Sequence, residues 1–154
     1  MPVGLIGSPS LSPPTIGVSV YKNHYTFSLL KRYKEFTFNL LDKNLVKKTI
    51  YLGSVSGKDV DKLRKSSLTL ARPKIIETPI LFESPINLEC KIIREIDFSN
   101  YCYFIGEIVY SHITRKYFNR RNKLKIDFEK LHPVVTLFLD FYEVKNFLGR
   151  YKAN

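Results

Sequence analysis

The sequence predicts a mainly β fold with a few short helices, arranged as a closed or split β-barrel. Three observations predict it: several segments alternate apolar and polar residues, helical spacing is confined to short stretches, and a long apolar segment follows directly on an alternating one. A barrel is a common way for a chain of many strands to avoid exposed sheet edges. The length of 154 residues fits a single domain spanning residues 1–154.

The first part of the chain is expected to run strand, helix, strand. Residues 15–20 and 35–40 both alternate apolar and polar side chains, which is the pattern of a strand with one buried face. Between them, Thr26 is a candidate N-cap for a short helix. Phe27, Leu30 and Tyr33 follow at spacings of three and share one face of that helix.

A more irregular segment follows. Residues 44–52 and 58–65 are short helical candidates around Gly53 and Gly57, and Asp59 is a candidate cap for the second of them. Three prolines then divide a connecting segment; these are Pro73, Pro79 and Pro85.

The clearest periodicity belongs to a predicted antiparallel hairpin. Residues 86–92 and 95–98 alternate apolar and polar side chains, and residues 101–113 are rich in aromatic and β-branched residues and apolar on both faces. Ser99-Asn100 is a two-residue turn candidate between them. Because both faces of the second strand need cover, we expect it to be central in its sheet. Residues 134–144 are the last strand candidate, with Val135, Leu137, Leu139 and Phe141 on one face.

The charge balance favours anionic ligands. Twenty-five Lys and Arg against 14 Asp and Glu give a formal net charge of +11, so phosphorylated ligands, nucleic acid and acidic headgroups are all candidates. No apolar run approaches the roughly 20 residues needed to cross a bilayer, and no signal-peptide pattern is present. The expected location is cytoplasmic. Cys90 and Cys102 form no disulfide framework, and we expect Cys90 to be buried, inert and unbonded.

One basic segment raises an alternative function. Residues 115–125 carry the densest positive charge, and Tyr117 and Phe118 lie within them. A basic, aromatic loop can bind single-stranded nucleic acid by phosphate contact and base stacking. A solvated surface loop is the simpler interpretation, so a nucleic-acid-binding barrel is kept as the alternative.

Several catalytic classes lack their motifs. His24, His112 and His132 share no metal-ligand spacing, and neither cysteine lies in a C-x-x-C pair, so no metal site is predicted. The sequence contains no G-x-S-x-G, no G-x-G-x-x-G and no G-x-x-x-x-G-K-[ST]. Hydrolase, Rossmann and P-loop functions therefore have no support, and no catalytic residue is assigned.

Two small-residue loops are candidates for binding an anion. In residues 7–14, Ser8, Ser10 and Ser12 alternate with other residues and lead through two prolines into a strand. Residues 53–62 combine glycines and serines before a predicted helix. Hydroxyls, loop N–H groups and helix N-termini all receive phosphate oxygens. An ordinary loop and an ordinary helix cap remain the alternatives.

The order and spacing of these and further motifs, over about residues 1–113, resemble the flavin reductase-like proteins, and the flavoredoxin branch in particular. The motifs are Ser-x-Ser-Pro-Pro before an alternating strand, Tyr25-Thr26, Glu35-Phe36 with Asn39, Gly53-x-x-Ser56-Gly57-x-Asp59-x-Asp61-Lys62, Glu83-Ser84-Pro85 with Leu88-Glu89-Cys90, and Phe104-Ile105-Gly106-Glu107-Ile108. The resemblance implies a split β-barrel of the FMN-binding type. It also implies a homodimer that holds FMN near its interface and often takes hydride from NADH or NADPH.

The resemblance assigns flavin roles by position. Ser8, Ser10 and Ser12 fall in the loop that borders the flavin. Thr26 falls at a helix start where a hydroxyl and N–H groups would meet the phosphate. Asn39 would offer its amide to a polar edge of the flavin, with satisfaction of backbone groups at a strand end as the structural alternative.

The second motif supplies the remaining assignments. Ser56, Gly57 and Lys62 lie in it, and Lys62 is the candidate counter-charge for the phosphate. A solvated Lys62 is the alternative. If FMN binds, the flavin itself carries the redox chemistry, so no catalytic triad is needed.

The sequence departs from the family pattern in three places. Members usually carry an extra strand and turn before the segment matching residues 1–6, so we expect this chain to begin inside the barrel. Tyr101 stands where many reductases have a histidine, and Leu5 stands where a tryptophan is common. Flavin binding is thus a firmer expectation than reductase activity, and a degenerate member without cofactor is a further alternative.

Overall fold

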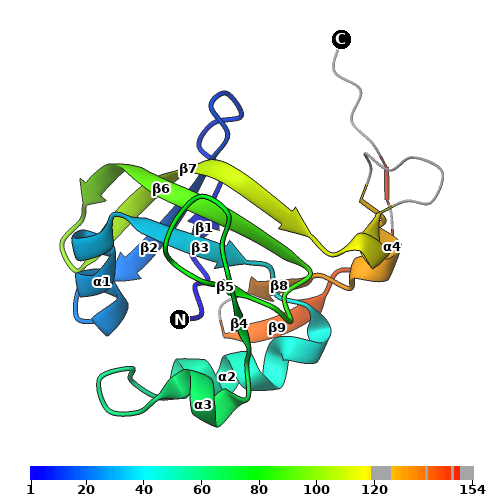
Figure 1. Cartoon of the computed structure of the whole chain (residues 1–154), viewed down its shortest axis with the longest axis horizontal. Helices are drawn as coiled ribbons and strands as arrows, with labels where there is room; N and C mark the ends of the chain where they lie inside the picture. The colour runs from blue at the N-terminus through cyan, green and yellow to red at the C-terminus, as the bar shows by residue number, and fades with distance from the viewer. Residues whose placement is uncertain (119–125, 138, 147, 150–154) are drawn as a thin grey trace.

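A five-stranded antiparallel sheet forms the centre of the computed structural model, which describes residues 1–118, 126–137, 139–146 and 148–149 (Figure 1). The strand order is β1-β2-β7-β6-β3. These strands are β1 Ile6–Gly7, β2 Thr15–Tyr21, β3 Glu35–Asn39, β6 Ile86–Asp97 and β7 Tyr101–Ile113. Two small sheets join β4 Leu70–Ala71 to β5 Ile80–Leu81 and β8 Val134–Leu137 to β9 Asp140–Glu143. The predicted mainly β fold is confirmed.

The predicted hairpin is the longest element pair. Strands β6 and β7 pair antiparallel around the Ser99-Asn100 turn, where the Phe98 N–H donates to the Tyr101 carbonyl at 2.9 Å. Strand β7 lies between β2 and β6, as its two apolar faces predicted. A side chain at Gly106 on β7 would meet the Phe36 ring of β3, since an added Cβ would lie 2.7 Å from Phe36 Cε1.

The helices are short, and two of their predicted caps were wrong. Helix α1 spans Tyr25–Tyr33 with His24 as N-cap, so Thr26 lies inside the first turn and caps nothing. Helix α3 spans Lys62–Ser66 and is capped by Asp61, not Asp59, because the Asp61 carboxylate accepts the Arg64 N–H at 3.1 Å. The others are η1 Lys43–Leu45, α2 Val46–Ser54, η2 Arg115–Tyr117 and α4 Phe128–Leu131.

The core lies between the inner face of the sheet and α1. Phe27 of α1 packs on Phe104 of β7, with ring centroids 5.9 Å apart, while Tyr33 at the end of α1 is exposed. Cys90 is buried, as expected, and so is Cys102, and both are unbonded. Burial raises the pKa of the Cys90 thiol to about 12. The buried cluster contains Ile16, Val18, Val20, Leu30, Phe36, Cys90, Cys102 and Phe104.

The single strand predicted for residues 134–144 was wrong. These residues form a hairpin instead, in which Val134 of β8 pairs with Glu143 of β9 and Leu137 pairs with Asp140. The apolar alternation continues through the turn, so periodicity alone could not place the reversal. Among the described residues, no helix is long and apolar enough to span a membrane.

Candidate functional site

The start of α1 and the loop between α2 and α3 lie against each other. Gly57 faces Tyr25, because a Cβ added to Gly57 would lie 3.3 Å from Tyr25 Cδ1. Lys62, at the start of α3, donates from Nζ to the Leu52 carbonyl at 2.6 Å, which ties α3 to the end of α2. The predicted residues Thr26, Ser56, Gly57 and Lys62 therefore belong to one region, which we call the α1 region.

The α1 region offers hydrogen-bond donors that fit a phosphate group. Helix α1 has no capping side chain and no acidic residue in its first turn, so the N-terminus presents N–H groups and a positive dipole end. Thr26 adds a half-buried hydroxyl, and Lys62 adds an ammonium group with N–H groups to spare. The nearby carboxylate of Asp61 is turned to the N–H of Arg64.

The serine loop lies elsewhere on the chain. Ser8 Oγ donates to the Thr15 carbonyl at 3.1 Å, the Ser10 N–H donates to Thr15 Oγ1 at 2.9 Å, and the Ser12 N–H donates to Ser10 Oγ at 3.1 Å. This loop precedes Thr15 at one end of β2, whereas α1 follows the other end (Figure 1). The seven residues of β2 put about 20 Å between these ends. Within one chain, the serine loop and the α1 region do not meet.

Asn39 lies in a third place, at the end of β3. Its Oδ1 accepts the Leu81 N–H at 3.0 Å, and its Nδ2 donates to the Thr37 carbonyl at 3.2 Å. These bonds agree with the structural alternative for Asn39, and its role toward a flavin stays a prediction. The Leu81 bond belongs to a larger arrangement in which residues 72–84, here called the strap, cross the outer face of the sheet in front of β3 (Figure 1).

Two carboxylates that stand in the quoted motifs, but to which the sequence analysis gave no role, hold the strap. Glu35 on β3 accepts the N–H groups of Glu77 and Thr78 at 2.9 and 2.7 Å. Glu89 on β6 is fully buried and accepts the N–H groups of Lys74, Ile75 and Ile76 at 2.6 to 3.0 Å. In the sequence both are glutamates on the polar face of an alternating strand, where a charged side chain is expected, so no sequence signal set them apart.

The environment of Glu89 fixes its charge. Burial alone would raise its pKa, but the hydrogen bonds from Lys74, His112, Ile76 and Ile75 outweigh burial and lower the pKa to about 2. His112 Nε2 lies 2.5 Å from Glu89 Oε1. Because the carboxylate only accepts, this nitrogen must carry a hydrogen.

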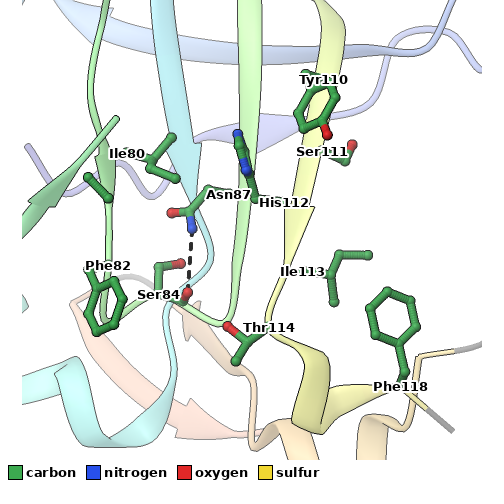
Figure 2. A pocket seen from close by; sticks show the side chains of 11 residues that line it. Ile80, Phe82, Ser84, Asn87, Tyr110, Ser111, His112, Ile113, Thr114 and Phe118 are labelled. Carbon is green, nitrogen blue, oxygen red and sulfur yellow. Dashed lines mark hydrogen bonds between the residues drawn. The ribbon is translucent and has the colours of Figure 1, made fainter. Parts of the chain in front are cut away.

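A pocket of about 440 Å³ opens beside this pair, between the strap and the end of β7 (Figure 2). It shares no residue with the predicted flavin site. The pocket lining is Ala71, Ile80, Phe82, Ser84, Asn87, Tyr110, Ser111, His112, Ile113, Thr114 and Phe118.

The basic segment gives little support to nucleic-acid binding. Tyr117 is buried rather than free to stack on a base, and residues 119–125 lie outside the described part of the chain. No group of three or more His, Cys, Asp and Glu within the described ranges could hold a metal ion.

A comparison with known protein families shows to which family this chain belongs. The sequence model of the flavin reductase like domain matches residues 1–126, which is most of the chain. The chain belongs to this family. A protein of Archaeoglobus fulgidus is 35% identical over 105 residues, 68% of this chain and 58% of that protein. One of Aeropyrum pernix is 30% identical over 64% of this chain and 38% of its own length. The chain thus spans little more than half the length of the first relative and less than half the length of the second.

Solved structures of two flavoredoxins are similar in fold to this chain. Flavoredoxin of Desulfovibrio vulgaris (Miyazaki F) matches with a TM-score of 0.88 and 27% identity, over 96% of this chain and 79% of that one. Flavoredoxin from Methanosarcina acetivorans matches with a TM-score of 0.86 and 28% identity, over 96% and 78% of the two chains. A solved split barrel domain from Shewanella frigidimarina NCIMB 400 matches with a TM-score of 0.86 and 18% identity, over 98% of this chain and 77% of that one, and this confirms the predicted split barrel fold.

Proposed function

We propose that this flavin reductase-like protein binds flavin mononucleotide and acts as an oxidoreductase, either by hydride transfer from NADH or NADPH to flavin or by flavin-based electron transfer. The observation that carries the proposal is the match of the flavin reductase like domain to residues 1–126, which include every element of the α1 region. The two flavoredoxins of similar structure support the same conclusion.

In the proposal the α1 region holds the phosphate group. Thr26 donates its hydroxyl, and the N–H groups of Tyr25 and Thr26 at the start of α1 are offered to the anion. Ser56 and Gly57 let the loop backbone approach closely, since Gly57 carries no Cβ against Tyr25. Lys62 supplies the counter-charge, held in place by its bond to the Leu52 carbonyl.

A homodimer is part of the proposal because β2 separates the serine loop from the α1 region by about 20 Å. The loop of a second chain, with Ser8, Ser10 and Ser12, offers hydroxyls that one chain alone does not bring to its own α1 region. Leu11 at the tip of this loop is 89% exposed, as expected of a side chain that packs on a partner. Asn39 is kept as a proposed contact to a polar edge of the flavin.

The protein contributes binding and orientation to the reaction. When bound, the flavin supplies the redox chemistry of hydride or electron transfer. The described residues position the phosphate, and the net charge of +11 attracts the anionic flavin and pyridine nucleotide. Two buried, unbonded cysteines suit a reducing cytoplasm, which is the location we propose.

Absorbance and titration test the proposal. The purified protein should show a flavin spectrum or bind added FMN with quenching of flavin fluorescence, and anaerobic NADH or NADPH should bleach the bound flavin. A flavin that binds but is not bleached by either nucleotide would leave electron transfer as the activity. A colourless protein that takes up no FMN would favour a family member without cofactor and would contradict the proposal.

A further inference from the structure

We propose that the pocket between the strap and the end of β7 is a second binding site, specific for a small, uncharged, planar aromatic molecule that carries one hydrogen-bond donor, of the phenol class. The site is distinct from the α1 region and from the serine loop, with which it shares no residue, and it lies beside Asn39, the cross-strand partner of Asn87. Its two walls come from segments far apart in the sequence and face each other across Asn87 and His112 (Figure 2).

Asn87 provides the strongest reason to expect a ligand. It lines the pocket and is only 5% exposed, yet its Oδ1 is buried without a hydrogen-bond partner. The amide orientation is fixed by Nδ2, which donates to the Ser84 carbonyl at 3.4 Å. The reversed amide would place two oxygens against each other. Buried polar atoms are nearly always satisfied, so the oxygen of Asn87 is an acceptor that awaits a donor from the ligand.

The walls of the pocket select a flat apolar body. Phe82 on the strap, Tyr110 on β7 and Phe118 after β7 contribute aromatic rings, and Ile80 and Ile113 contribute aliphatic surface. A volume of about 440 Å³ lies in the usual range for small-molecule pockets, about 300 to 1,000 Å³. Stacked or edge-on contacts with these rings favour an aromatic ligand over an aliphatic one.

The electrostatics select a neutral ligand. Of the described residues that line the pocket, none carries a carboxylate or an ammonium group. The His112 ring in this lining is held through Nε2 by the ionised carboxylate of Glu89. An anionic ligand would face this carboxylate and the oxygen of Asn87, and a cation would find no lining group to pair with it. A neutral hydroxyl donates to Asn87 without either cost.

Binding of phenol and anisole to the intact protein tests the inference. Anisole has the same ring but no donor, so the difference between the two ligands isolates the hydrogen bond to Asn87. We expect phenol to bind about tenfold more tightly than anisole, which is the usual effect of satisfying a buried acceptor. Titrations by calorimetry, with amide chemical shifts to locate the site, measure both affinities. Equal affinities, or shifts outside the pocket, would overturn the proposal.

Two variants test the hydrogen bond to Asn87 and the aromatic walls of the pocket separately. Asn87→Leu should remove the preference for phenol and leave anisole binding unchanged, whereas Asn23→Leu, the same change at an exposed position before α1, should alter neither. Phe82→Ala changes a side chain that is 71% exposed, so it should leave folding intact and weaken both ligands about threefold or more. If Asn87→Leu fails to fold, Phe82→Ala still tests the proposal, since unchanged binding of phenol and anisole by this variant would contradict the site.

Competition with FMN distinguishes this site from the proposed flavin site. We expect saturating FMN to leave phenol affinity unchanged. Displacement of phenol by FMN would overturn the claim of a second site. Phenol binding in a protein that takes up no FMN would sustain this inference while the proposed function fails.

Discussion

The strap and the α1 region use polar groups in opposite ways. Under the strap, Glu35 and Glu89 direct their carboxylates at backbone N–H groups of the same chain, and Glu89 is fully buried. In the α1 region, Thr26 and Lys62 are only half-buried, and the first turn of α1 has no side-chain cap. The polar groups that hold the strap are already satisfied by protein, whereas the polar groups proposed to bind phosphate still have hydrogen-bonding capacity. This contrast distinguishes the strap from the proposed phosphate site more clearly than residue type does.

The largest expected effect falls on the strap. Glu89→Gln leaves buried N–H groups without a charged acceptor and should reduce the free energy of unfolding by about 3 to 5 kcal/mol. Glu95→Gln is the control, because Glu95 pairs with Lys31 and Lys34 at the surface and should cost less than about 1 kcal/mol. Urea unfolding measures both. Similar losses for the two variants would contradict the structural role of Glu89.

The pH dependence of stability should report the same carboxylate. The pKa of Glu89 in the folded protein is lowered from 4.5 to about 2, so its stabilising contribution is present above pH 4.5 and is lost as the pH falls toward 2. Unfolding free energies at pH 5, 4 and 3 should decline in the wild type and decline less in Glu89→Gln. Parallel declines in the two proteins would assign the acid sensitivity to other groups.

Substitutions in the α1 region should change FMN affinity more than the free energy of unfolding. Lys62→Met removes the proposed counter-charge and should weaken FMN binding about tenfold, the effect of losing one charge-assisted hydrogen bond. It should cost about 1 kcal/mol in unfolding, since the bond to the Leu52 carbonyl is also lost. Lys58→Met, at an exposed position of the same loop, is the matched control. Equal FMN affinities for the two variants would remove Lys62 from the site.

The smallest expected effect comes from the loop backbone. Gly57→Ala would place a Cβ 3.3 Å from the Tyr25 ring, so the loop must shift by a few tenths of an ångström. We expect FMN binding to weaken about threefold, because a small displacement of positioned donors reduces charge-assisted hydrogen bonding. Gly53→Ala meets only an ordinary 3.6 Å contact with Pro2 and should leave FMN binding unchanged. An equal loss of FMN affinity in both variants would contradict a specific role of the Gly57 backbone.

Sequence periodicity predicted the parts of the fold that are long and regular. Strands β2, β3 and β6 follow apolar alternation, the Ser99-Asn100 turn marks the hairpin, and β7 is central as its composition indicates. Strands β1, β4 and β5 have two residues each, which is too short for any period to appear. The β8–β9 turn was missed because alternation continues across it.

The candidate site was harder to predict, because a sequence gives order and not distance. The motifs that carry Ser8 and Thr26 are close in sequence, yet β2 keeps them apart. Glu89 appeared only as part of a motif, since its N–H donors lie 13 to 15 residues upstream in a segment without periodicity. The pocket beside Asn87 joins the strap to β7 and needs the register of three strands before it can be recognised.

The most direct test of the α1 region as a phosphate site is a paired titration of the wild-type protein with FMN and with riboflavin, which differ only in the phosphate. Flavin fluorescence quenching measures both affinities under the same conditions. We predict that FMN binds at least about tenfold more tightly than riboflavin and that Lys62→Met removes most of this difference. Equal affinity for the two flavins, or no binding of either, would contradict the account.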